Sequence, residues 1–157
     1  MPALLLFSGI LVLLGAATCD IRARRIPNVL PVSLALLGVA RLLNAALVQG
    51  GLLGAGLVPD MIVAFAVFFA GAGLFGAGLL GGGDVKLLAA GSLWLGAARL
   101  PDFLFVTALS GGFLAIVYLA GRMMAPRPAD GTVAPIRLPY GVAIAMGGIV
   151  AAVGFLG

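Results

Sequence analysis

The chain has 157 residues, of which 63% are hydrophobic and only 9% are charged, with a net charge of +4. This composition lies far outside that of soluble domains and is typical of an integral membrane protein. One cysteine and no histidine exclude an intramolecular disulfide framework and argue against a metalloprotease. The cations are spread over short loops, so nucleic acid is not an expected partner.

Six apolar stretches follow one another along the chain, each close to the roughly 20 residues that a helix needs to cross a bilayer. We therefore expect an all-α, polytopic membrane helix bundle with about six transmembrane helices, forming one domain over residues 1–157. Little sequence remains for a soluble domain. The expected spans are residues 3–19, 29–48, 58–79, 85–99, 101–121 and 139–156.

A short basic loop with Arg22, Arg24 and Arg25 follows the first span. The positive-inside rule keeps such a loop in the cytoplasm. If the loops then alternate between sides, seven of the nine cations are cytoplasmic, and only Arg41 and Arg99 lie towards the outside. We expect both termini outside, with Arg41 extending its charge to the nearby outer surface.

Two of the expected helices open with proline followed by aspartate, at Pro59-Asp60 and Pro101-Asp102. Proline fits the first turn of a helix, and the helix dipole favours a carboxylate there. Helix-start chemistry is therefore the simpler interpretation of both aspartates. The alternative is an outward-facing catalytic pair made of Asp60 and Asp102.

Small residues four positions apart recur in two spans, and such spacing lets helix backbones approach closely. We expect packing ridges from these residues and a plain cytoplasmic linker, or alternatively a cover for the site, from residues 121–138. The ridge residues are Ala72, Gly73, Gly76 and Ala77 in span three and Ala143, Gly147 and Ala151 in span six.

Two aspartates lie at ends of apolar spans, where an ionisable group is a candidate for function. Asp84 follows the glycine triplet 81–83, Asp20 precedes the basic loop, and the topology puts both on the cytoplasmic side. Glycines give the backbone freedom to expose Asp84 and let a substrate strand approach. Alternatively, Asp84 only caps the fourth helix, and Asp20 is an interfacial anion neutralised by the arginines. Two facing carboxylates in a bilayer suggest an aspartyl protease.

Three segments resemble the type IV prepilin peptidase family, which is related to the Gly-x-Gly-Asp intramembrane aspartyl proteases. DIRARRIPN at residues 20–28 is similar to the family's first aspartate motif, and GGGDVKLLAA at 81–90 is similar to its second. LPYGVAIAMGG at 138–148 is similar to its C-terminal Pro-Tyr-Gly-x-Ala helix. The resemblance implies that Asp20 and Asp84 are catalytic. It also gives supporting roles to Gly81, Gly83, Lys86, Asn28, Pro139, Tyr140 and Gly141.

The resemblance further implies cleavage of a prepilin precursor at the cytoplasmic face of a bacterial inner membrane, between a basic leader and a hydrophobic helix. One carboxylate would take a proton from water while the other donates one to the carbonyl, without a metal or organic cofactor. The short chain resembles the Flp, or tight-adherence, branch, so no N-methylation and no S-adenosylmethionine site are expected. Lys86 is about 200° around the helix from Asp84, so headgroup contact competes with substrate contact. For Asn28, helix capping competes with substrate contact.

Two readings from other classes stay open. In a small ion- or proton-coupled transporter, Asp20, Asp84 and Lys86 would form an ion path. In a non-catalytic pilus-assembly membrane subunit, the acidic residues would only cap helices. A transporter would more often carry its charges near the bilayer midplane and show an internal repeat, whereas these charges lie at span ends. The sequence does not indicate an oligomeric state.

Overall fold

The computed structural model of the chain describes residues 1–49, 51, 56–124 and 138–155, and these contain helices but no strand. The all-α prediction is therefore confirmed for the described residues. Of the predicted linker, residues 121–124 continue a helix, and 125–137 lie outside the described part. The helices are α1 (Ala3–Ala23), α2 (Val29–Gln49), α3 (Leu57–Gly76), α4 (Gly82–Leu95), the 3₁₀ turn η1 (Ala97–Arg99), α5 (Leu100–Met124) and α6 (Tyr140–Val153).

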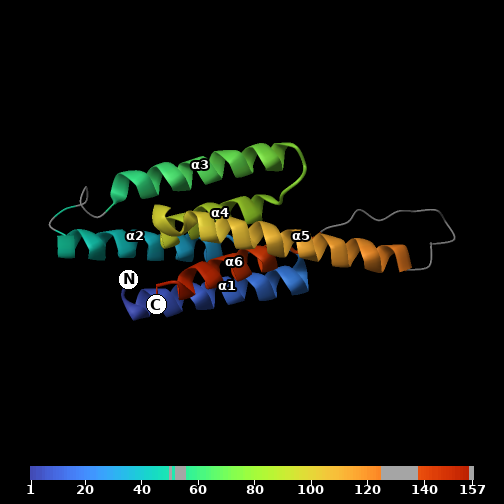
Figure 1. Cartoon of the computed structure of the whole chain (residues 1–157), viewed down its shortest axis with the longest axis horizontal. Coiled ribbons are helices and arrows are strands. Elements are labelled where there is room, and N and C mark those ends of the chain that lie inside the picture. The colour runs from blue at the N-terminus through green and yellow to red at the C-terminus, as the bar shows by residue number, and fades with distance from the viewer. Residues whose placement is uncertain (50, 52–55, 125–137, 156–157) are drawn as a thin grey trace.

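Successive helices run in opposite directions along the bundle (Figure 1). As a result α1, α3 and α5 finish at the end where α2, α4 and α6 begin. We call this the motif end, because residues 20–28, 81–90 and 138–148 all reach it. The start of α1 and the finish of α6 lie together at the opposite end (Figure 1).

Four segments are long and apolar enough to cross a membrane by length and composition, namely α1, α2, α3 and the continuous stretch Ala97–Met124. The chain is accordingly a multi-pass membrane protein. The helices α4 and α6 have 14 residues each, or about 21 Å at 1.5 Å per residue. The predicted fourth span ends early because Gly96, with φ 81°, turns the chain into η1. A count of six crossings stays a prediction.

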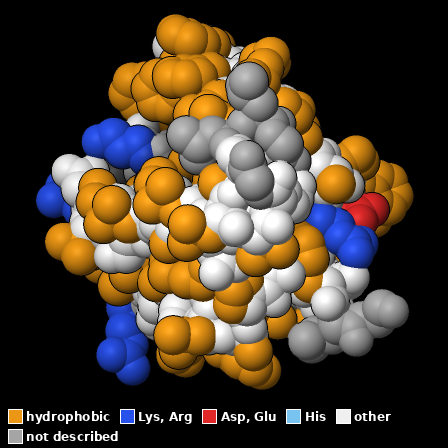
Figure 2. Space-filling model, turned by 90° about the vertical axis from the view of Figure 1, so that its left-hand side faces the viewer, with side chains coloured by type: hydrophobic (Ala, Val, Ile, Leu, Met, Phe, Trp, Pro, Cys, Tyr) orange, Lys and Arg blue, Asp and Glu red, His pale blue; other side chains and the backbone are white. Residues whose placement is uncertain are grey.

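The two short helices form the interior, while α3 and α5 lie outside them. Trp94 of α4 and Ile144 of α6 are fully buried, whereas Phe65 on α3 and Phe113 on α5 are well exposed. Seen from the end opposite the motifs, hydrophobic side chains cover much of the surface, and charged side chains lie around its rim (Figure 2). The exposed phenylalanines on α3 and α5 are what a bundle surrounded by lipid tails requires.

Close contacts at glycines hold α4 between α1 and α2. A Cβ atom on Gly9 of α1 would lie 2.2 Å from the Trp94 ring, and one on Gly38 of α2 would lie 2.9 Å from the Leu93 side chain. The Trp94 indole also donates a hydrogen bond to the carbonyl of Leu5, at 3.2 Å. These contacts fix the position of α4, which carries one of the two candidate aspartates.

The packing ridge predicted for span six is confirmed, and the one predicted for span three is wrong. In α6, a Cβ on Gly147 would lie 2.1 Å from the hydroxyl of Thr107 in α5. In α3, Gly73 and Gly76 have no atom of another segment within 4 Å of a Cβ position. The contact glycine of α3 is instead Gly71, which packs on α4.

Candidate active site

Asp20 lies in the last turn of α1 and is 6% exposed. Its Oδ2 atom accepts a hydrogen bond of 2.7 Å from the backbone N–H of Gly141, the second residue of α6. Backbone N–H groups in the first turn of a helix have no partner within that helix and readily bind a carboxylate. Asp20 therefore provides a partner for the start of α6 while remaining on α1.

The end of α1 is shaped by Arg24, which adopts a left-handed conformation with φ 49° and donates its N–H to the carbonyl of Asp20 at 2.9 Å. The guanidinium of Arg24 lies within electrostatic range of the Asp20 carboxylate. No salt bridge joins Asp20 to a cation among the described residues. Arg24 therefore attracts the Asp20 carboxylate electrostatically, as the basic-loop alternative expects, but without a direct ion pair.

Asp84 is the third residue of α4, and its side chain is half-buried. The helix begins after Gly81, which occupies the N-cap position, so Asp84 is not the N-cap residue itself but takes part in capping from the third position of the helix. Its Oδ2 atom does accept the N–H of Gly81, at 3.2 Å. Asp84 thus satisfies one free N–H at the start of the helix and still has three acceptor lone pairs.

The motif glycines provide space rather than unusual backbone angles. Gly81 is extended, with φ −79°. A Cβ atom on Gly81 would lie 2.6 Å from Oδ2 of Asp84, and one on Gly83 would lie 3.2 Å from the Cβ of Ile26. Close approach, more than conformational freedom, is therefore the physical reason for glycine at these two positions.

The three motifs meet at one place. Ile26, from the first motif, lies against Gly83 of the second and within 3.0 Å of a Cβ position on Gly141 of the third. The Asp20 and Asp84 carboxylates are close enough for their charges to repel each other. Residues far apart in the chain thus form one cluster at the motif end of the bundle.

The remaining predicted site residues lie around this cluster. Lys86 donates a 3.0 Å hydrogen bond from Nζ to Oδ1 of Asn28, and both side chains are exposed. Headgroup or substrate contact for Lys86, and helix capping or substrate contact for Asn28, stay predictions. Pro139 is buried at the N-cap of α6, and Tyr140 packs near Gly111 of α5. These last two residues set where α6 begins.

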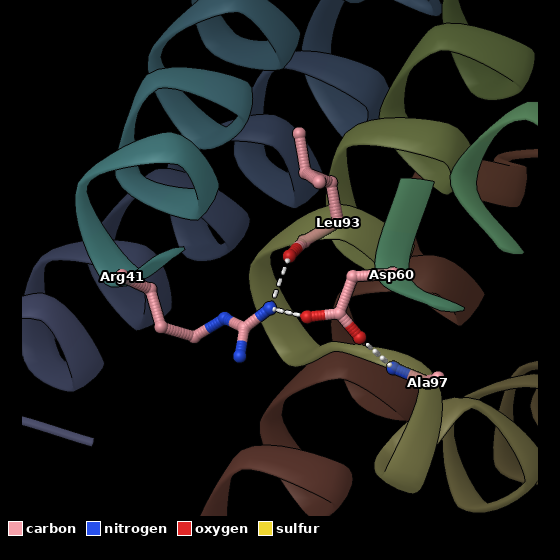
Figure 3. A network of polar contacts seen from close by, with 4 residues as sticks. All are labelled: Arg41, Asp60, Leu93 and Ala97. Carbon is pink, nitrogen blue, oxygen red and sulfur yellow. Dashed lines mark hydrogen bonds and ion pairs between the residues drawn. The ribbon is translucent and has the colours of Figure 1, made fainter. Parts of the chain in front are cut away.

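The interpretation of Asp60 and Arg41 needs correction. Asp60 is 5% exposed and forms an ion pair with Arg41, while its other oxygen accepts the N–H of Ala97 at 2.7 Å. Arg41 also donates to the carbonyl of Leu93, at 3.3 Å (Figure 3). Arg41 does not extend to the surface, and Asp60 is not merely a helix-start residue. Sequence reasoning missed this pair, although two opposite charges at neighbouring ends of adjacent spans were a usable signal.

Asp102 behaves as expected for a helix-start residue. It lies in the first turn of α5, and its exposed carboxylate is 3.5 Å from the guanidinium of Arg99. Asp60 points into its own network, so the two outer aspartates do not converge on a site. Among the described residues, no group of three or more Cys, Asp or Glu side chains has the arrangement of a metal site.

Fold and site together define a helical membrane protein with two carboxylates converging near one end of its bundle. The chain belongs to the type IV leader peptidase family, whose model matches residues 6–116. This match contains Asp20, Asp84 and Lys86, while Gly141 lies beyond it. Searches among curated proteins and among solved structures found no match. Membership points to a leader peptidase that acts on a pilin precursor.

Proposed function

We propose that the protein is an aspartic-type endopeptidase that removes the basic leader from Flp-like type IV prepilins at the cytoplasmic membrane face. The observation that carries the proposal is the convergence of Asp20 and Asp84 from two separate helices, around Ile26, which contacts both Gly83 beside Asp84 and Gly141 bonded to Asp20. Membership of the leader peptidase family supplies the class of reaction.

The distribution of charge supports a cytoplasmic site. Arg22, Arg24, Arg25 and Lys86 lie at the motif end, and Arg41 and Arg99 at the opposite end. Positive-inside topology would then place the two candidate carboxylates at the cytoplasmic face and the opposite end outside. The basic leader of a precursor would start on that side.

In the proposed reaction a water molecule between the two carboxylates attacks the scissile carbonyl carbon. One carboxylate takes a proton from this water, and the other, in its protonated form, donates one to the carbonyl oxygen. The tetrahedral intermediate then collapses, with breakage of the C–N bond and transfer of a proton to the leaving amine. The hydrogen bond from Gly141 holds the Asp20 carboxyl group in one orientation, which favours a defined geometry.

The positions of the carboxylates also favour a protease over the transporter reading. Asp20 is in the last turn of α1, and Asp84 is in the first turn of α4. An ion path would more often place its charges near the bilayer midplane. Cleavage beside a membrane surface instead needs them near a helix end.

Substitution of each aspartate tests the proposal. Asp20→Asn and Asp84→Asn keep the size of the side chain and an acceptor oxygen for the N–H groups of Gly141 and Gly81. Co-expressed with a prepilin precursor, each variant should process it slower by a factor on the order of 10²–10⁴. The measurement is the size of the precursor, alongside the amount of protein in the membrane.

Asp102→Asn is the matched control, because this exposed carboxylate lies at the opposite end and should be dispensable. Normal cleavage by either Asp20→Asn or Asp84→Asn, at equal membrane levels, would falsify the assignment. Loss of cleavage in Asp102→Asn at a normal level would also contradict it.

A further inference from the structure

A groove of about 740 Å³ opens between α2 and α3, with α4 as its floor. Both outer helices pack extensively on α4 but scarcely on each other. The groove therefore runs along the outside of the bundle, where lipid or a partner can enter from the side. Its size lies within the range of binding sites for other molecules.

One face of each helix lines the groove, with helical spacing. The floor is Lys86, Ala89, Ala90 and Leu93 of α4. From Lys86 to Leu93 it extends about 10 Å along the helix axis. One wall is formed by Asn28 and by α2 from Pro31 to Val39, and the other by α3 from Met61 to Phe68.

The walls suit a helix better than a single acyl chain. Small side chains lie on all three helices, at Ala35, Ala64, Ala89 and Ala90. Small residues let the backbone of another helix approach closely, which is the main way in which helices associate in membranes. Phe65 and Phe68 border the same space from α3 and provide contact area.

One end of the groove is polar and lies at the motif end, as the candidate active site does, although Lys86 and Asp84 point to opposite sides of α4. Lys86 and Asn28 line this end and are bonded to each other. Lys86 is two residues after Asp84 in the sequence, and Asn28 is two residues after Ile26. The Lys86 ammonium has three N–H donors and uses one on Asn28. The other donors suit the free carbonyl groups of a non-helical chain leaving the groove.

We propose that this groove is the docking site for the apolar helix of the precursor. The helix lies against α4 between α2 and α3, and the non-helical segment before it passes Lys86 and Asn28 towards Asp20 and Asp84. This inference rests on the proposed function and adds to it the surface that selects the substrate. On this inference, a precursor needs an apolar helix to be cleaved efficiently.

Disulfide cross-linking tests the position of the helix without requiring cleavage. The full chain carries Cys19→Ser and Asp84→Asn, together with Ala64→Cys, which places a thiol in the groove. The precursor carries single cysteines at successive positions of its apolar helix. After oxidation in membranes, cross-linked product should be several-fold above background and should peak every three or four positions.

Ala66→Cys in the same background is the matched control, since Ala66 lies on the same helix, is exposed and does not line the groove. Equal yields from Ala64→Cys and Ala66→Cys, or yields without helical spacing, would overturn the proposal. Equal yields are the result expected if lipid chains alone occupy the groove.

A kinetic test uses the catalytically intact chain. Ala64→Leu narrows the groove and should raise KM for the precursor by about tenfold, the size of a typical overpacking effect. The value of kcat should change little, because Ala64 is distant in sequence and position from the two carboxylates. Ala66→Leu should leave both constants unchanged.

The two proposals fail in different ways. If the unmodified protein processes the precursor but Ala64→Cys and Ala64→Leu behave like their controls, only the groove assignment is wrong. If the unmodified protein does not process the precursor, both proposals fail.

Discussion

The hydrogen bond between Gly141 and Asp20 ties the third motif to the first. A Cβ atom at position 141 would lie 2.9 Å from Oδ2 of Asp20 and 3.0 Å from Cδ1 of Ile26. Contacts this short cannot be accommodated without a shift of one partner. The helix start and the carboxylate therefore fit together only when residue 141 has no side chain.

Gly141→Ala should accordingly reduce precursor processing, by up to about 10²-fold if the carboxylate moves by about 1 Å. Alanine has a higher helix propensity than glycine, so weakening of α6 would not explain the loss. The processing rate and the thermal unfolding temperature in detergent are the measurements. Gly73→Ala is the control because no other segment lies within 4 Å of that position. Normal processing by Gly141→Ala would show that the contact is not needed for the site.

At the scale of elements, the Arg41–Asp60 pair joins three parts of the chain. Arg41 lies on α2, Asp60 on α3, and Leu93 and Ala97 on either side of the break between α4 and η1. The Nε atom of Arg41 is buried without an acceptor in the described part of the structure. The pair thus links α2 and α3 near the end of the bundle remote from the motifs.

Breaking this pair should destabilise the protein. Arg41→Met or Asp60→Asn alone leaves a buried charge without its partner and should cost roughly 3–5 kcal/mol in the free energy of unfolding. The double variant removes both charges and keeps an acceptor for the N–H of Ala97, so it should be more stable than either single variant. Denaturation in detergent measures the three values. A double variant no more stable than the singles would contradict the argument.

Asp102→Asn is again the control, because an exposed ion pair contributes about 0–1 kcal/mol. We therefore expect a large loss of stability from substitution of Asp60 and little or none from substitution of Asp102. A substitution at Asp60 can lower processing simply by lowering the amount of folded protein, so it is unsuitable as a test of catalysis.

The helix boundaries were predictable to within about one turn because hydropathy and the positions of proline and glycine are local properties. The same holds for Asp20 and Asp84 as candidates, since each stands out within its own segment. The partners were not predictable. Whether Lys86 meets Asn28, or which glycine of α3 meets α4, depends on the register between helices, and a single sequence carries no direct record of it.

At the scale of the whole molecule, the uneven distribution of cations predicts which end of the bundle faces the cytoplasm. The topology predicts that a cysteine introduced by Arg24→Cys or Met124→Cys, in a Cys19→Ser background, resists an impermeant maleimide in intact cells. Gly51→Cys should label, since residue 51 follows α2 at the opposite end. Labelling before and after permeabilisation provides the comparison. The reverse pattern would place the candidate site outside the cell and exclude cleavage of a cytoplasmic leader.

The unequal lengths of the helices bear on the supply of water. Asp20 and Asp84 each lie within about 5 Å, along the helix axis, of a helix end. Hydrolysis consumes one water molecule per bond, and the hydrocarbon region contains almost none. At about 21 Å, α4 and α6 are shorter than the roughly 30 Å hydrocarbon core. Under the proposed function, a thicker bilayer would bury the start of α4 more deeply and reduce the supply of water to Asp84, so turnover should fall as the surrounding membrane thickens.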